Sequence, residues 1–234
     1  MRPLNQMDFL ALWEKGNSLH PLDKGIMAVQ AAFPEMNENI ADWPIGRRNR
    51  ALAEMRRAAF AVALRGWSQC PYCGEQLEFE IDGNMLAEGE IPEPDACVVV
   101  GGKSYRLPTS RDLAAVVNVR DENAAARMLL KKCCISKMSH DSAWSDDEVE
   151  EIGQSMAAAD PLAEILLSFD CPNCETHFDK SLDMPSFFWA EMESQAKRLL
   201  MEVHMLASAY GWSQSEILSL SPVRRNFYLD MVRS

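Results

Sequence analysis

Two pairs of cysteines carry the clearest chemistry in the sequence. Cys70 and Cys73 enclose Pro-Tyr, and Cys171 and Cys174 enclose Pro-Asn, so both pairs have the form Cys-Pro-x-Cys. Two residues between thiolates let a tight turn aim both sulfurs at one cation, and two such knuckles complete a closed tetrahedral shell. The sequence therefore predicts one structural Zn²⁺ ion bound by Cys70, Cys73, Cys171 and Cys174.

The distance between the two pairs is unusual for a zinc ribbon. The pairs are 97 residues apart, so the intervening segment must be an insertion that the metal closes. Glu175 stands where such knuckles usually have glycine, which weakens the turn argument but leaves all four ligands. His177 could replace one ligand, although four thiolates leave it no vacancy. A redox dithiol in either pair, or two sites that serve separate partners, are the alternatives.

The elements that must position these cysteines are mostly helical. Pro21 and Pro44 each begin a helical segment, and the apolar stripe of the second is expected to continue through Phe60, Val62 and Leu64. Alternation in residues 74–84 indicates a strand that runs into a turn at Asp82-Gly83, and a second strand is expected in residues 97–107. The segments 144–149 and 212–217 each carry a capping box and a hydrophobic staple.

These patterns predict a mainly α fold with a small β zinc ribbon, an α+β class. Its two knuckles are brought together around a long, largely helical insertion. The expected regions are an N-terminal helical region (1–66), a first knuckle with a β-hairpin (67–106), an inserted helical region (107–164), a second knuckle (165–184) and a C-terminal helical hairpin (185–234). A loop is expected near residues 136–143.

Composition narrows the classes of function. The chain has 35 acidic and 23 basic residues and a formal charge of −12, which disfavours broad binding to nucleic acid. No apolar run is long enough for a membrane helix, and Asp8 and Glu14 interrupt the N-terminus too early for a secretory signal, so a cytoplasmic protein is expected. There, seven cysteines fit four ligands plus buried thiols at Cys97, Cys133 and Cys134.

No spacing of residues indicates catalysis or a small-molecule substrate. The sequence offers no nucleophile with a nearby base and no phosphate-binding glycine loop, and a closed four-cysteine site leaves no position for an activated water. We therefore expect a protein that is not an enzyme. Its remaining functional surface is the arginine segment with Arg47, Arg48 and Arg50, which is equally well interpreted as a binding face or as a solvated helix face.

The C-terminal sequence resembles a known family. Residues 188–232 resemble a signature in which a helix ends in E-x-H-x-L-A-x-x-Y-x-W-S, followed by E-I-L-x-L and R-R-x-x-Y-L. The matching positions are Glu202, His204, Leu206, Ala207, Tyr210, Trp212, Ser213, Glu216, Ile217, Leu218, Leu220, Arg224, Arg225, Tyr228 and Leu229. The blocks HPLDKGIMAV, DWPIGRRNRAL, CPYCGEQLEFE and YRLPTSRDLAAV resemble the same group, the T-even-type phage baseplate hub assembly proteins.

This resemblance implies a non-enzymatic assembly chaperone or a minor baseplate component of a contractile tail or a phage-derived contractile injection system. Its expected partners are baseplate hub, spike or other tail proteins. The candidate contact residues are Arg47, Arg48, Arg50, Trp212, Arg224, Arg225 and Tyr228. The alternative is a zinc-ribbon regulator that binds nucleic acid, but the residues after the first knuckle are acidic rather than basic.

Overall fold

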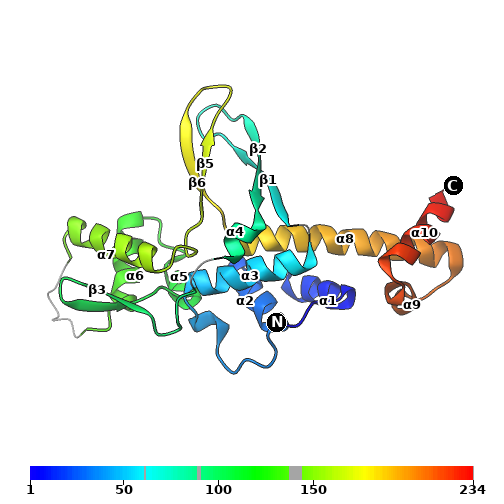
Figure 1. Ribbon diagram of the computed structural model, residues 1–234, viewed down its shortest axis with the longest axis horizontal. Helices are drawn as coiled ribbons and strands as arrows, with labels where there is room; N and C mark the ends of the chain where they lie inside the picture. Colours follow the sequence, from blue (N-terminus) through cyan, green and yellow to red (C-terminus); the bar gives the residue numbers. More distant parts are fainter. Residues whose placement is uncertain (61, 89–90, 137–143, 234) are drawn as a thin grey trace.

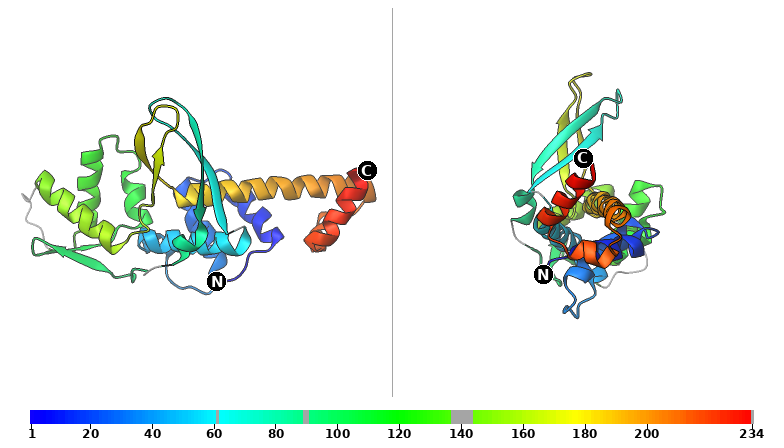
Figure 2. Two further views of the ribbon diagram at one scale, coloured as in Figure 1. Left: turned by 45° about the horizontal axis from the view of Figure 1, so that its top comes forward. Right: turned by 90° about the vertical axis from the view of Figure 1, so that its right-hand side faces the viewer.

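One long helix, α8 (Met184–Tyr210), forms the axis of the protein in this computed structural model. The structure describes residues 1–60, 62–88, 91–136 and 144–233. In Figure 1 the N-terminal helices cover the first half of α8, a mixed lobe lies beyond its N-terminal end, and a small helical unit lies at its other end. Two β-ribbons rise from the middle, and the right-hand view in Figure 2 shows them extending beyond the helical body.

Three helices build the body around α8. They are α1 (Gln6–Gly16), α2 (Pro21–Ala32) and α3 (Ile45–Ala59), with a 3-10 turn, η1 (Ile40–Asp42), before α3. Asn5 and Asp8 form a capping box that begins α1, and Pro21 occupies the first turn of α2, as its position predicts. The apolar faces of these helices meet α8 in one core, whose most enclosed members include Ala28, Val29, Leu52, Met184 and Met192.

Most of the segment between the cysteine pairs forms a separate lobe. It contains the hairpin β3 (Cys97–Val100) and β4 (Lys103–Arg106), followed by α5 (Ser110–Val116), α6 (Glu122–Cys133) and α7 (Asp146–Ala159). Its own core includes Tyr105 and Trp144, and the Trp144 indole N–H donates to the Tyr105 hydroxyl at 2.9 Å. The predicted capping box of Ser145 and Glu148 begins α7.

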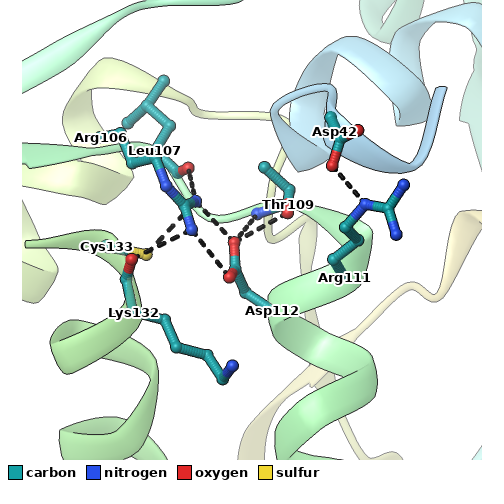
Figure 3. A network of polar contacts seen from close by, with 8 residues as sticks. All are labelled: Asp42, Arg106, Leu107, Thr109, Arg111, Asp112, Lys132 and Cys133. Atoms are coloured by element: carbon teal, nitrogen blue, oxygen red, sulfur yellow. Dashed lines mark hydrogen bonds and ion pairs between the residues drawn. The ribbon is translucent and has the colours of Figure 1, made fainter. Parts of the chain in front are cut away.

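Arg106 joins three elements of this lobe (Figure 3). Its guanidinium donates to both carboxylate oxygens of Asp112, at 2.6 and 2.9 Å, and to the carbonyl of Lys132 at 3.0 Å. Burial alone would raise the pKa of Asp112, but hydrogen bonds from Arg106 and Thr109 outweigh it and hold that pKa below its ordinary value. Arg106 therefore fixes β4 against the start of α5 and the end of α6.

The two β-ribbons together form what we call the arm. The first ribbon pairs β1 (Ala63–Gln69) with β2 (Gln76–Asp82), and the second pairs β5 (Leu166–Asp170) with β6 (His177–Ser181), both antiparallel. A short helix, α4 (Gly83–Ala87), follows the first ribbon. The cysteine pairs lie in the turns at the outer ends of the ribbons, so the arm carries them away from the body.

A compact C-terminal unit, which we call the head, ends the chain. Gly211 adopts a left-handed conformation (φ 71°) that ends α8, and the predicted capping box of Ser213 and Glu216 then begins α9 (Gln214–Ser219). The last helix is α10 (Pro222–Arg233). Leu206, Ile217 and Leu229 are buried where these three helices meet.

The structure bears out the expected mixed architecture and corrects several details. Helix α3 ends at Ala59, and the chain enters strand β1 at Ala63, inside the region expected to be helical. The expected turn at Asp82-Gly83 is instead the start of α4, where Asp82 accepts the backbone N–H of Asn84 at 2.9 Å. The single strand expected in residues 97–107 is the β3–β4 hairpin. The loop expected near residues 136–143 lies almost entirely outside the described residues.

Candidate metal centre and contact surfaces

The two knuckles have the same backbone construction. In the first, the backbone N–H of Cys70 donates to the Glu75 carbonyl at 2.8 Å, and that of Gly74 donates to the Cys70 carbonyl at 3.0 Å. In the second, Cys171 donates to Thr176 at 3.1 Å and Glu175 donates to Cys171 at 2.9 Å. Each turn closes the hairpin of its ribbon and orients two thiols in the same way.

The residue after each second cysteine has a positive φ. Gly74 has φ 78° and Glu175 has φ 56°. Glycine adopts this region without steric cost, whereas a side chain such as that of glutamate is disfavoured there. Glu175 therefore keeps the knuckle conformation despite the unfavourable residue type, and the second turn is locally strained where the first is not.

The four sulfurs of the two knuckles converge as the sequence predicts. The Sγ atoms of Cys70, Cys73, Cys171 and Cys174 all lie within 4.8 Å of one another. Sulfurs from different ribbons are 3.6 Å apart for Cys70 and Cys174, and 3.5 Å apart for Cys73 and Cys171. Bonds of about 2.3 Å in a tetrahedral zinc site would place sulfurs about 3.8 Å apart. The cluster thus has the donor type, number and spacing to hold one metal ion.

The surroundings shift the thiols in opposite directions. Hydrogen bonds from Thr176 lower the pKa of Cys174 to about 6, and a hydrogen bond from the Asn173 side chain lowers the pKa of Cys73. Burial is the main cause that raises the pKa of Cys171 to about 11. At neutral pH without a cation, the cluster would therefore hold both thiolate and thiol. A bound divalent ion would favour the thiolate form at all four positions.

An aromatic cluster packs the two ribbons together below the cysteines. Phe169 stacks on Phe178 with ring centroids 5.3 Å apart, and Phe79 meets Phe169 edge to face at 5.9 Å. Leu77 and Leu167 complete this packing. The contact between ribbons thus continues beyond the sulfurs, which explains why sequences so far apart in the chain align their knuckles.

His177 lies beside the cluster without entering it. Its Nδ1 is 2.9 Å from a carboxylate oxygen of Asp170, and its side chain is exposed. The hydrogen bond with Asp170 raises the pKa of His177 above its ordinary value. Its placement matches a strand residue rather than a replacement ligand.

The other three cysteines differ from one another. Cys133 is fully buried, and burial raises the pKa of its thiol to about 11, which fits the expected inert thiol. Cys134 is half-buried. Cys97 is exposed, so the expectation that it is buried was wrong: it lies at the start of β3, with its side chain on the solvent face.

The arginine segment is mainly an internal structural element. Arg48 is buried and donates to the Ser110 hydroxyl at 2.8 Å, so it cannot contact a partner. Arg47 is largely covered; its guanidinium lies over the Trp43 ring at 4.5 Å. Arg50 is mostly buried and pairs with Glu54 at 3.0 Å. The expectation of a contact face was wrong for Arg48, and Arg47 and Arg50 already have partners within the chain.

Arg56 has a structural role that was not expected from the sequence. Its side chain is only 2% exposed and binds both carboxylate oxygens of Glu191 on α8, at 2.7 and 2.9 Å. The same guanidinium donates to the carbonyl of Ala63 at 2.7 Å, where β1 begins. Arg56 therefore anchors the base of the arm to the long helix. Its spacing of four residues from Leu52 was the available signal, because it places both on one helix face.

The candidate contact residues of the head divide into two groups. Arg225 is buried, pairs with Glu202 at 2.7 Å and donates to Gln6 at 2.6 Å, so its expected role as a contact residue was wrong. Arg224 is exposed on α10. Trp212 and Tyr228 are half-buried and form a trio of rings with Tyr210, with centroids 4.7 to 5.6 Å apart.

The described residues contain no helix that is both long enough and apolar enough to cross a lipid bilayer. Comparison of the chain with models of protein families, with curated proteins and with solved structures gives no match.

Proposed function

We propose that the protein is a non-enzymatic assembly factor, or a minor structural component, of the baseplate hub in a phage-like contractile tail or injection system. The proposal joins the resemblance of the C-terminal sequence to an observation on the head. Val223, Phe227 and Met231 follow one another at intervals of four residues on α10 and are 69%, 68% and 57% exposed. This row of exposed apolar side chains is the observation that carries the proposal, because such patches mark protein-binding surfaces.

The surroundings of this row suit a protein partner. Arg224 lies next to Val223, and the ring trio of Tyr210, Trp212 and Tyr228 adjoins the same helix. Tyrosine, tryptophan and arginine are the residue types that dominate the energetics of protein interfaces. The buried Glu202–Arg225 pair holds α10 against α8, so the surface is presented by a fixed support.

The metal in this proposal is a single structural Zn²⁺ ion bound by the four cysteines. Four thiolates in two matched knuckles are the donor set of structural zinc sites, and a closed shell leaves no coordination position for a substrate. The ion would join two ribbons that are far apart in the sequence. In this role zinc stabilises the arm and takes no part in chemistry.

Nucleic-acid binding by the arm is the weaker hypothesis. The first ribbon carries Glu75, Glu78 and Glu80 on its exposed positions. These carboxylates would repel a phosphate backbone. A filter-binding assay at low salt, with zinc-loaded protein, would revive that hypothesis if it detected DNA or RNA.

The test of the assembly role is retention of partners encoded beside this protein. Tagged full-length protein is co-expressed with the neighbouring hub, spike and tape-measure products, and the retained proteins are identified by mass spectrometry. Val223→Asp should lower retention at least tenfold, and aspartate in the first turn of α10 is compatible with the helix. Val99→Asp is the matched control, because Val99 is also 69% exposed but lies on β3 in the inserted lobe.

The result that contradicts the assembly role is equally specific. If no neighbouring product is retained, and deletion of the gene leaves intact contractile particles, the protein does not act in hub assembly. If both aspartate variants lose partners equally, the α10 surface is not the contact face.

A further inference from the structure

The first ribbon presents one edge of β1 without a strand neighbour. The backbone N–H of Cys70 donates to Glu75 and that of Gly83 donates to the Val62 carbonyl, so residues 62 and 70 face β2. In an antiparallel pair the bonded positions alternate. The even-numbered residues of β1 therefore bond to β2, and the N–H and C=O groups of its odd-numbered residues point to the other side.

The base of that outer edge has a partner among the described residues. The Ala63 carbonyl accepts from Arg56, which confirms that odd-numbered groups point away from β2. Beyond it, Arg65 and Trp67 direct their backbone groups outward, and among the described residues β1 pairs with β2 alone. Trp67 is also 64% exposed, a large value for this residue type. An open edge of this kind is a template for another strand.

A groove of about 500 Å³ runs along the same edge. One wall is formed by residues 65–68 of β1, the opposite wall by Leu167 and Phe169 of the second ribbon, and the floor by Phe187 and Ala190 of α8. Gly66 lines this groove beside the rings of Phe79 and Phe187, which a larger residue at that position would meet. Its lining is mostly apolar and would accept an apolar side chain.

Ser68 supplies an observation that points to a ligand. This residue lines the groove and is only 2% exposed, and its hydroxyl has no hydrogen-bond partner among the described residues. An unsatisfied buried hydroxyl is destabilising, and a polar group that enters the groove would supply the missing bond.

The charges at the groove favour an acidic residue in the ligand. The carboxylate of Glu191 is bound by Arg56, and Arg65 is paired with Glu80. The carboxylate of Asp183 accepts the Ser186 hydroxyl and is attracted by the charge of Arg48. Lys180 lines the same groove and makes no ion pair with any described residue. A carboxylate of the ligand beside Lys180 would give this lysine an ion-pair partner.

We propose that the outer edge of β1 accepts an extended segment of a partner protein as an additional strand. One apolar side chain of this segment enters the groove, and an acidic side chain lies beside Lys180. Main-chain hydrogen bonds to the strand edge supply affinity in this binding mode, and the side-chain pocket supplies specificity. The surface is distinct from the head, so this inference does not depend on the contractile-tail assignment.

The experiment uses the zinc-loaded full-length protein and a displayed library of random linear 12-residue peptides. Selected peptides are expected to alternate apolar residues and to include an acidic one. A fluorescein-labelled peptide from the enriched set is then titrated against variants by fluorescence anisotropy. Ala190→Trp fills the groove from α8 and should weaken binding at least tenfold. Ala209→Trp, an exposed alanine on the same helix outside the groove, should leave binding unchanged.

A second variant tests the strand edge by itself. Trp67→Pro removes an outward N–H without breaking a β1–β2 bond and should lower affinity, whereas Trp67→Ala keeps that N–H and isolates the effect of the ring. Zinc content and circular dichroism confirm that each variant is folded. The proposal is overturned if no peptide is enriched, if Ala190→Trp and Ala209→Trp bind equally well, or if Trp67→Pro binds no more weakly than Trp67→Ala. It is also overturned if the protein dimerises and Ala190→Trp makes it monomeric, because the occupant is then a second copy.

Discussion

Replacing Arg56 by methionine tests whether the arm is anchored as the contacts indicate. The substitution removes two charge-assisted hydrogen bonds to Glu191 and one hydrogen bond to the Ala63 carbonyl. The Val62 carbonyl, which also accepts from Arg56, keeps its bond from Gly83. Among the described residues, the substitution thus leaves one carboxylate and one carbonyl without their bonds from Arg56.

The expected loss of stability follows from burial. Removing one partner of a buried ion pair costs about 3–5 kcal/mol, and an orphaned carbonyl adds about 1 kcal/mol. The Glu191 side chain is 26% exposed and can recover part of its hydration, whereas Arg56 is 2% exposed. We therefore expect Arg56→Met to lower the free energy of unfolding by about 3–4 kcal/mol.

Urea unfolding of the zinc-loaded protein, followed by far-ultraviolet circular dichroism, measures this loss. Arg57→Met is the matched control, because Arg57 is the next residue on α3 and is exposed. It should change the unfolding free energy by less than about 0.5 kcal/mol. A loss below about 1 kcal/mol for Arg56→Met, the magnitude of a surface ion pair, would refute the anchoring role.

Three further predictions concern the metal, the strained knuckle and acid stability. Cys73→Ser should lower bound zinc well below one equivalent by elemental mass spectrometry, whereas Cys97→Ser should retain it; equal retention would contradict a four-thiolate site. Glu175→Gly relieves a positive φ and should raise the unfolding free energy by about 0.5–1 kcal/mol in urea, and a decrease would show that the Glu175 side chain has another role. Asp112 has a lowered pKa, so its contribution is present above its ordinary pKa of 3.8 and is lost as pH falls through the lower folded value. Stability should thus fall more steeply below about pH 4 in the native protein than in Asp112→Asn, and parallel curves from pH 5 to pH 2 would contradict the Arg106 contact as the cause.

The four-cysteine cluster could be predicted from the sequence because its signal is local. A Cys-Pro-x-Cys turn needs only the backbone around it, so the convergence of two knuckles follows from their type and number. The capping boxes at Ser145 and Ser213 are local in the same sense, and both begin helices as expected. Even Glu175, which weakened the pattern, kept the turn conformation.

The burial of several arginines could not be predicted from the sequence. Arg48 and Arg56 are four residues before and after Leu52, so all three lie on one buried face of α3. Whether a charged residue on such a face is buried depends on Ser110 and Glu191, which are distant in the chain. Arg225 has the same relation to Leu229, and its partner Glu202 also lies on another helix.

Strand β1 was overlooked for a similar reason. Phe60, Val62 and Leu64 fit the continuation of a helical stripe, but they also fit the alternation of a strand. Only pairing with β2 across the first knuckle distinguishes the two, because the register joins Leu64 to Ile81 and Gly66 to Phe79. The groove depends on this pairing and on contact with the second ribbon, so no local pattern could indicate it.

The order of the two ribbons along the chain has a consequence for synthesis on the ribosome. The first knuckle is complete at Cys73, but the last thiol of the four-cysteine cluster, that of Cys174, follows about a hundred residues later. At about 5–20 residues per second, a nascent chain carries an unpaired dithiol for roughly 5–20 s. During that interval the inserted lobe can fold around its own core. The second ribbon is synthesised afterwards and packs against the first ribbon once the lobe between them is folded. Capture of a metal ion by all four thiols would thus be a late step, and it would join the early and late halves of the chain.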